Sequence, residues 1–219
     1  MKNTLVLLGI GTLALLTTAG CVQRETTLVG SRAAGDAALR DGEFALAAQE
    51  YERYLEERPA RREVMYDLGR AYEGMGEMSA AREAYSLAYE LDPFNPDYID
   101  AMARAIAANG ETDAAFDVLE QIARETERSD AYARLGRFLL EFGFPDEAVL
   151  AFRTAAGIDP SGSSYLELAE VLSDFGDREG ALAALSHALW FEPESAGAKS
   201  LVRSLGQVPG PTFASPPSP

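Results

Sequence analysis

Small, aromatic and aliphatic residues recur at a fixed interval over most of the chain, from about Leu28 onward. Four prolines mark the interval: Pro59, Pro93, Pro160 and Pro193 lie 34, 67 and 33 residues apart, which is one, two and one periods. A period of this length is typical of a helical hairpin repeated in tandem, where each hairpin buries its apolar face against its neighbours. The pattern predicts an all-α body of stacked helix-turn-helix units.

Aligning the copies on these prolines puts small and aromatic residues in register. The second copy has Leu68, Gly69, Tyr72, Gly76, Ala81, Tyr85, Ala88 and Pro93. The fourth copy has Tyr132, Leu135, Gly136, Gly143, Ala148, Phe152, Ala155 and Pro160. The first and fifth copies follow the same pattern, whereas the third has Thr112 where an aromatic residue is usual and lacks a closing proline.

Each of these positions has a physical reason. A small residue in the first helix, such as Gly69 or Gly136, allows the second helix to approach closely, while Tyr85 or Phe152 fills the space between layers. Glycines after the first helix, of which Gly76 is one, suit a left-handed residue at the helix end. The second helix ends at the proline, which has no amide hydrogen to donate.

This pattern resembles the tetratricopeptide repeat family. The resemblance implies a right-handed superhelical solenoid over residues 31–193, with about five repeats. Their approximate bounds are 28–61, 62–95, 96–128, 129–161 and 162–194. Apolar residues on one side of residues 195–206 predict a capping helix over the last repeat, and the proline-rich residues 207–219 predict a disordered tail.

The N-terminus has the pattern of a targeting signal: Lys2 precedes an uncharged, apolar stretch over residues 5–16. The following residues, Thr18-Ala19-Gly20-Cys21, resemble the lipobox of bacterial lipoproteins, although the family prefers leucine where Thr18 stands. The resemblance implies a signal peptide over 1–20, an acylated Cys21 and a tether over 21–30. The alternatives are a transmembrane anchor, for which the segment is slightly short, and an ordinary signal followed by an incidental cysteine.

The residue after the lipid site is Val22 rather than aspartate. In bacteria that sort lipoproteins by that position, valine favours the periplasmic face of the outer membrane. The expected location is therefore the bacterial cell envelope, with the body held to the membrane by lipid alone.

Charge narrows the range of partners. The chain has 35 acidic and 19 basic residues, a net charge of −16, and no run of Lys or Arg. Such a protein repels phosphate backbones, so we expect no nucleic-acid partner. A hydrophobic content of 47% is sufficient for a folded core.

Candidate catalytic chemistry is scarce in this sequence. His187 is the only histidine and Cys21 the only cysteine, so neither a two-histidine metal site nor a disulfide within the chain can form. We expect no metal, no cofactor, no small-molecule substrate and no enzymatic activity, and His187 is expected to face solvent.

Candidate binding residues come from the first helices, which line the concave face in the tetratricopeptide family. Arg70, Arg104 and Arg137 occupy equivalent positions on three successive first helices, and Arg32 and Tyr66 lie one turn earlier on the same face. One interpretation is that the arginines bind carboxylates or carbonyls of a peptide. The other is pairing within each helix, of Arg104 with Asp100, Arg137 with Glu141 and Arg70 with Glu73.

These observations predict a membrane-anchored scaffold or assembly factor that binds a protein client in its concave groove. The chain resembles tetratricopeptide lipoproteins that act as pilus pilotins or support outer-membrane barrel assembly. A structural, self-associating envelope protein is the alternative, and an enzyme or enzyme subunit is a third class.

Overall fold

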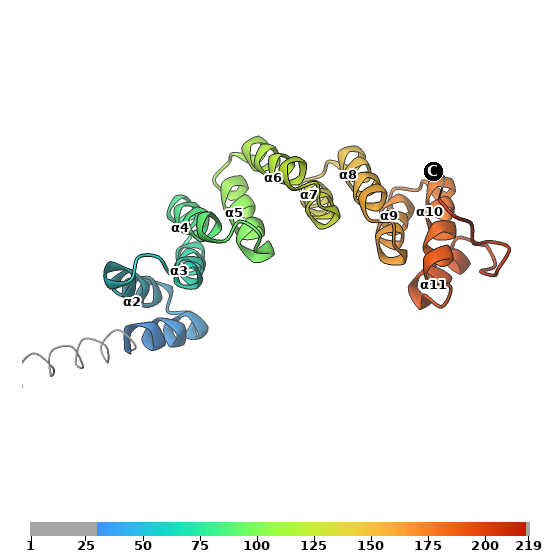
Figure 1. The fold of residues 1–219 in the computed structure, drawn as a ribbon. Helices are drawn as coiled ribbons and strands as arrows, with labels where there is room; N and C mark the ends of the chain where they lie inside the picture. Colours follow the sequence, from blue (N-terminus) through green and yellow to red (C-terminus); the bar gives the residue numbers. More distant parts are fainter. Residues whose placement is uncertain (1–29, 218–219) are drawn as a thin grey trace, which may run out of the picture. The chain divides into compact units, whose positions relative to one another are not determined.

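The computed structural model describes residues 30–217, and within this range the regular secondary structure is α-helical, without strands. The predicted signal peptide, Cys21 and most of the tether lie outside the described residues. Consecutive helices pack in antiparallel pairs (Figure 1), which confirms the expected all-α repeat fold. The chain divides into two compact units, one ending at Gly110 and the other beginning at Glu111.

The first unit contains a helix over residues 30–41 and four further helices. These are α2 (Phe44–Glu57), α3 (Arg62–Met75), α4 (Met78–Leu91) and α5 (Pro96–Ala108). Helix α3 packs against α2 and α4, and α4 also packs against α5. The core of this unit is built from alanines and from the fully buried rings of Tyr51 and Tyr85.

The second unit follows the same order of packing. Its helices are α6 (Thr112–Thr126), α7 (Ser129–Glu141), α8 (Pro145–Ile158), α9 (Gly162–Asp174), α10 (Arg178–Phe191) and α11 (Ala196–Ser204). The tightest pairs are α7 with α8 and α9 with α10. The repeat expected at 96–128 is therefore divided, because α5 belongs to the first unit and α6 to the second.

Glycines in the first helices allow each hairpin to close. A Cβ built on Gly69 would lie 2.5 Å from the Tyr85 ring, and one on Gly136 would lie 2.8 Å from the Phe152 ring. Both distances are shorter than van der Waals contact, so only glycine fits beside an aromatic ring at this spacing. In the fifth repeat Ala169 and Leu185, both fully buried, occupy the corresponding positions.

In the third repeat, which has no closing proline, helix α6 ends at a residue in the left-handed region. Glu127 lies in the left-handed region, with φ 49°, and its N–H donates to the carbonyl of Ala123. A non-glycine residue adopts this conformation at some cost. The other left-handed residues in the described part of the chain are glycines that follow a first helix, as Gly76 does, or follow α11.

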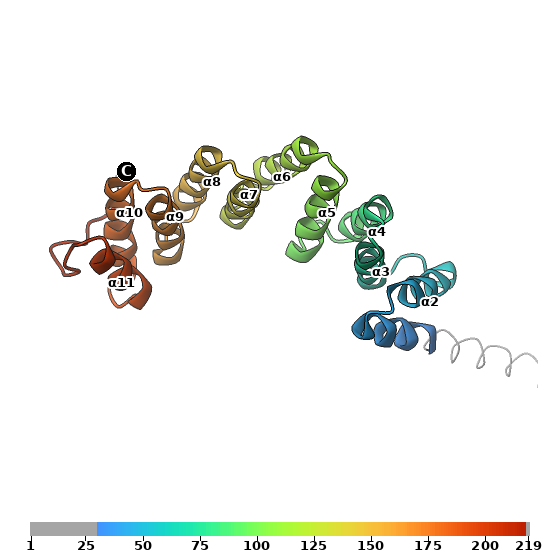
Figure 2. The ribbon, with the colours of Figure 1, turned by 180° about the vertical axis from the view of Figure 1, so that it is seen from behind.

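Helix α11 packs on α10 and α9, with Ala198 and Val202 fully buried. The segment that follows departs from the predicted disordered tail: residues 207–217 return beside α10, as Figures 1 and 2 both show. Hydrogen bonds from Ser186 and His187 to the backbone of this segment hold it in place. The proline-rich composition predicted disorder because composition contains no information about the α10 surface that the segment contacts.

Candidate binding face on the first helices

Side chains at equivalent positions on the first helices form what we call the first-helix face. In the first unit this face includes Arg32, Tyr66, Arg70 and Arg104, whereas Arg137 belongs to the second unit. The three arginines at equivalent positions are thus divided between two units.

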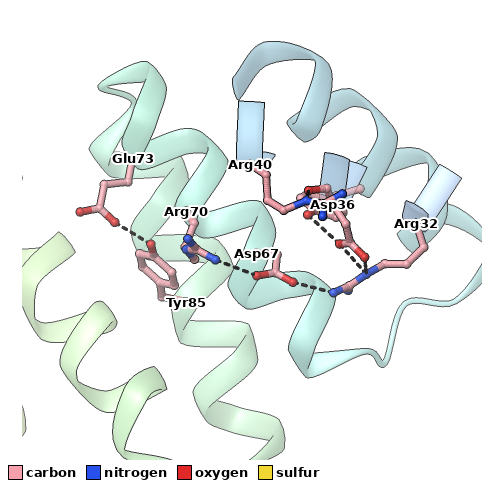
Figure 3. Close-up of polar contacts among 8 residues, drawn as sticks. Arg32, Asp36, Arg40, Asp67, Arg70, Glu73 and Tyr85 are labelled. Carbon is pink, nitrogen blue, oxygen red and sulfur yellow. Dashed lines mark hydrogen bonds and ion pairs between the residues drawn. The ribbon is translucent and has the colours of Figure 1, made fainter. Parts of the chain in front are cut away.

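A half-buried carboxylate brings together two of the predicted residues in the first unit. Asp67 on α3 accepts from Arg32 on the preceding first helix, with 2.6 Å between Nη2 and Oδ2. Its other oxygen lies 3.5 Å from Nη1 of Arg70 (Figure 3). Arg32 also pairs with Asp36, at 2.9 Å between Nε and Oδ1. We call these four residues the Asp67 cluster.

The electrostatics of the cluster follow from the position of its central carboxylate. The Asp67 side chain is 17% exposed. Burial raises its pKa above the usual range, and the charges of Arg32 and Arg70 offset this effect only in part. Arg70, in contrast, is 52% exposed and has guanidinium N–H groups that remain accessible to a partner.

Two buried tyrosines brace the same face. The Tyr51 hydroxyl donates to Asp36 Oδ1 at 2.9 Å, and the Arg32 guanidinium lies 5.4 Å from the centroid of the Tyr51 ring. The Tyr85 hydroxyl donates to Glu73 Oε2 at 2.7 Å. Burial, together with these hydrogen bonds to carboxylates, raises the pKa of both phenols. Glu73 therefore accepts from Tyr85, and Arg70 pairs with Asp67 rather than with Glu73.

Tyr66 contributes an aromatic contact to this part of the face. Its ring centroid lies 5.5 Å from that of Tyr85 and 5.1 Å from that of Tyr98. The three rings join α3, α4 and α5 in one tilted cluster. Arg104 lies on α5 with its side chain exposed.

The second unit has a cross-repeat ion pair on its first-helix face. Arg137 Nη1 lies 2.6 Å from Glu167 Oε1, so the pair joins α7 to α9. Arg137 is 54% exposed. It lines an open cavity of about 560 Å³, which Glu167, Ile158 and the serines Ser161, Ser163 and Ser164 also line.

A second ion pair lies at the rim of this cavity. Arg128 Nε donates to Asp130 Oδ1 at 2.8 Å. This hydrogen bond holds the pKa of Asp130 below its usual range. The cavity therefore contains both signs of charge and several neutral hydroxyls, which can bind polar groups of a peptide.

The residues that orient the arginines were missed by the sequence-based reasoning. Asp67 and Glu167 occupy the same position of the repeat, one residue after Tyr66 in α3 and one residue after Leu166 in α9. Each accepts from an arginine on the preceding first helix. One signal for these pairs was present in the sequence: an acidic residue occurs at the same aligned position of two repeats, and each of these acids follows an arginine by about one period.

Residues with possible chemistry outside this face serve other contacts. His187 on α10 has its Nδ1 3.0 Å from the carbonyl oxygen of Ser215, and its ring contacts Tyr165 edge-on. Within residues 30–217 no group of three or more His, Cys, Asp or Glu side chains is placed to hold a metal ion. In the same range no helix is both long and apolar enough to span a bilayer.

Comparisons with known proteins agree with the repeat pattern. Residues 32–96 match the family model described as tetratricopeptide repeat. Small glutamine-rich tetratricopeptide repeat-containing protein 2 of Mycosarcoma maydis is 39% identical over 83 residues, 37% of this chain and 24% of that protein. The match thus spans about a quarter of the length of this curated relative.

Solved structures match over more of the chain. A crystal structure of MamA protein is 26% identical and covers 78% of this chain and 94% of its own, with a TM-score of 0.51. MamA 41-end from Desulfovibrio magneticus RS-1 is 17% identical and covers 77% and 97%, with a TM-score of 0.50. The second likeness is one of fold alone.

Proposed function

We propose that this chain, which is a tetratricopeptide repeat protein and so has the fold of a protein-interaction scaffold, binds a protein client through its first-helix face. One observation carries the proposal. Arg70 and Arg137 are each positioned by an acid of the same repeat column, yet each remains about half exposed. An arginine that is oriented but accessible is suited to binding a carboxylate or a carbonyl oxygen.

The client segment that fits this face is polar and carries carboxylates. A guanidinium has five N–H donors, and a single carboxylate neighbour uses at most a part of them. Each additional charged hydrogen bond contributes about 1.5–3 kcal/mol when partly desolvated. The net charge of −16 opposes an acidic segment at long range, so local arginine contacts must provide the attraction.

The decisive experiment replaces Arg70, Arg104 and Arg137 together by glutamine and measures client capture from detergent-solubilised membranes at two salt concentrations. A matched control replaces Arg53, Arg124 and Arg153 by glutamine. These arginines lie on the second helices α2, α6 and α8, so their replacement changes the net charge by the same amount. We expect capture to be lost in the first variant, retained in the control, and weakened by salt in the wild type. Equal capture by both variants would contradict a role for the first-helix face.

The membrane anchor is the second part of the proposal: an acyl group on Cys21 would hold the protein in the bacterial envelope, on the periplasmic face of the outer membrane. The sequence Thr18-Ala19-Gly20-Cys21 after an apolar stretch supports this assignment. Each buried acyl CH₂ contributes about 0.8 kcal/mol, so two or more chains hold an acidic protein without further contacts.

Mass spectrometry of the mature N-terminus tests the anchor. We expect an acylated Cys21 in the wild type and no lipid in a Cys21→Ser variant, which should leave the membrane fraction. A wild-type chain that begins elsewhere than at Cys21 would contradict the assignment. The self-associating alternative would instead give a lipid-free form whose mass rises with concentration.

A further inference from the structure

Helix α10 differs from the other second helices at two surface positions. Trp190 is 52% exposed, at a position where the other repeats have charged or small residues. The equivalents of Trp190 are Glu56, Glu90, Arg124 and Gly157. Ser186 is only 8% exposed, although its equivalents in the other repeats are half-buried or exposed. The equivalents of Ser186 are Glu52, Ser86, Glu120 and Arg153.

The C-terminal segment, residues 207–217, is what covers Ser186. Ser186 Oγ donates to the carbonyl of Phe213 at 2.8 Å, and the Ser186 carbonyl accepts from the N–H of Ser215 at 3.3 Å. His187 Nδ1 lies 3.0 Å from the Ser215 carbonyl oxygen. The hydroxyls of Ser186 and Ser215 are 2.6 Å apart. Most of these contacts are therefore made with the main chain of the segment, not with its side chains.

A largely apolar cavity adjoins these hydrogen bonds. It has a volume of about 490 Å³ and is lined by Leu189 and Trp190 from α10 together with Pro193, and by the ion pair of Glu194 and Lys199. Pro209 and Pro211 of the segment line its other side. Prolines favour an extended backbone before binding, so a proline-containing segment loses little entropy when it docks beside an aromatic side chain.

We propose that the α10 surface formed by Ser186, His187, Leu189 and Trp190 is a second protein-binding site, separate from the first-helix face. It takes a proline-containing peptide by its main chain, and residues 207–217, which turn at Gly210–Phe213, occupy it in cis. A partner protein that presents such a segment binds when it displaces the chain's own segment.

The occupant in trans is a partner protein rather than a second copy. A tethered segment has an effective concentration on the order of millimolar, so an identical segment from another copy, with the same contacts, cannot displace it at lower concentrations. A partner peptide displaces it by making better contacts, for instance with a larger apolar side chain in the open cavity beside Trp190.

The test uses the full-length chain with residues 208–217 replaced by a Gly/Ser sequence of equal length. The probe is a labelled synthetic peptide of residues 207–217, and its anisotropy reports binding. We expect saturable binding to the Gly/Ser variant and binding at least tenfold weaker to the wild type. Adding Ser186→Ala or Trp190→Ala to the variant should weaken binding at least tenfold, whereas Ser86→Ala, at the same position of α4, should not.

Trp190 is the only tryptophan, so its fluorescence reports on this site without any label. We expect a red shift in the Gly/Ser variant and its reversal by added peptide. A further measurement uses the chain with its natural C-terminal segment. The Ser215 amide should be protected from hydrogen exchange in the wild type and should lose this protection in a Ser186→Ala variant. An unprotected Ser215 amide, or no peptide binding by the folded Gly/Ser variant, would overturn the proposal. A wild-type dimer formed by exchange of segments would overturn the choice of a partner protein.

Discussion

The ring of Phe152 occupies the space that a side chain at residue 136 would need: a Cβ built on Gly136 would lie 2.8 Å from Cε2 of that ring. Residues sixteen apart pair in the same way in other repeats. Gly35 with Tyr51 and Gly69 with Tyr85 combine a glycine with an aromatic residue. In the pair of Ala169 with Leu185, alanine is larger than the glycine of the other pairs and leucine is smaller than their aromatic residue. The second residue of every pair is buried.

The first prediction is that Gly136→Ala destabilises the second unit by about 1–3 kcal/mol, because the ring of Phe152 is fully packed and cannot retreat without strain. Gly157→Ala is the matched control. No atom outside its own neighbourhood lies within 4 Å of the Cβ position on Gly157, so alanine there should be neutral or stabilise α8 by up to about 1 kcal/mol. Urea unfolding measures both changes.

A second prediction follows from the alternative pair. Phe152→Leu alone should leave a cavity and destabilise the unit. The double change Gly136→Ala with Phe152→Leu reproduces the combination of Ala169 and Leu185, so its cost should be less than the sum of the two single costs by at least about 1 kcal/mol. Additive costs in the double-mutant cycle would show that the two positions do not share one space.

The third prediction concerns alkaline pH. Burial raises the pKa of Tyr72 from 10.0 to about 12, with a hydrogen bond to Glu52, and raises those of Tyr51 and Tyr85 further. A phenol whose pKa is higher in the folded state contributes stability that is present below pH 10 and is lost as the pH rises through the folded value.

The first unit should therefore lose stability between about pH 10 and pH 12, and Tyr72→Phe should reduce that loss. Circular dichroism and phenolate absorbance, followed in the same titration, measure unfolding and ionisation together. Tyrosines that all ionise near pH 10 before any loss of helix would argue against these buried hydrogen bonds.

A fourth prediction separates the two sides of the Asp67 cluster. Because burial raises the pKa of Asp67 above 3.8, its ionised form opposes folding, and the stability that it contributes is present at low pH and lost as the pH rises through the folded pKa. Asp67→Asn should therefore be neutral or slightly stabilising at pH 7, and less favourable relative to wild type at pH 4.

Arg32→Gln should instead cost about 1.5–3 kcal/mol at pH 7, because it removes the charged donor from a buried carboxylate. Chemical unfolding of both variants at the two pH values provides the comparison. A larger loss at pH 7 for Asp67→Asn than for Arg32→Gln would reverse this assignment.

The fifth prediction concerns the cross-repeat pair. Glu167→Gln should change stability by less than about 1 kcal/mol, since both partners of the pair are partly exposed. The same change removes the carboxylate that orients Arg137, so the variant should bind an acidic client more weakly than wild type. Calorimetric titration with the captured client measures this, and tighter binding would mean that Glu167 competes with the client for Arg137.

The repeat architecture was predictable because it depends on local spacing. Gly69 and Gly136 lie one and three periods into a pattern that proline positions already mark, and each is paired in the structure with an aromatic residue named from the sequence. The partner of each arginine was not predictable in this way. Arg137 pairs with Glu167 because of the offset between stacked helices, which spacing within one helix does not contain.

The position of residues 207–217 also escaped prediction, for a different reason. A proline-rich composition describes a segment that cannot form its own core, but it is silent about a surface elsewhere that can hold it. The relevant signal lay in α10, where Trp190 departs from the charged or small residues of the other repeats. An exception to a repeat is thus more informative about binding than its regular positions.

The pairing of Gly136 with Phe152 also limits how such a gene can change its number of repeats. Unequal crossing-over that exchanges whole hairpins keeps each small residue with its own partner. Between a glycine–aromatic repeat and the repeat of Ala169 and Leu185, a crossover within the hairpin would place glycine opposite leucine, leaving a void, or alanine opposite a ring, creating a clash. Viable recombinants should therefore have their junctions between hairpins, in the turns that follow the second helices.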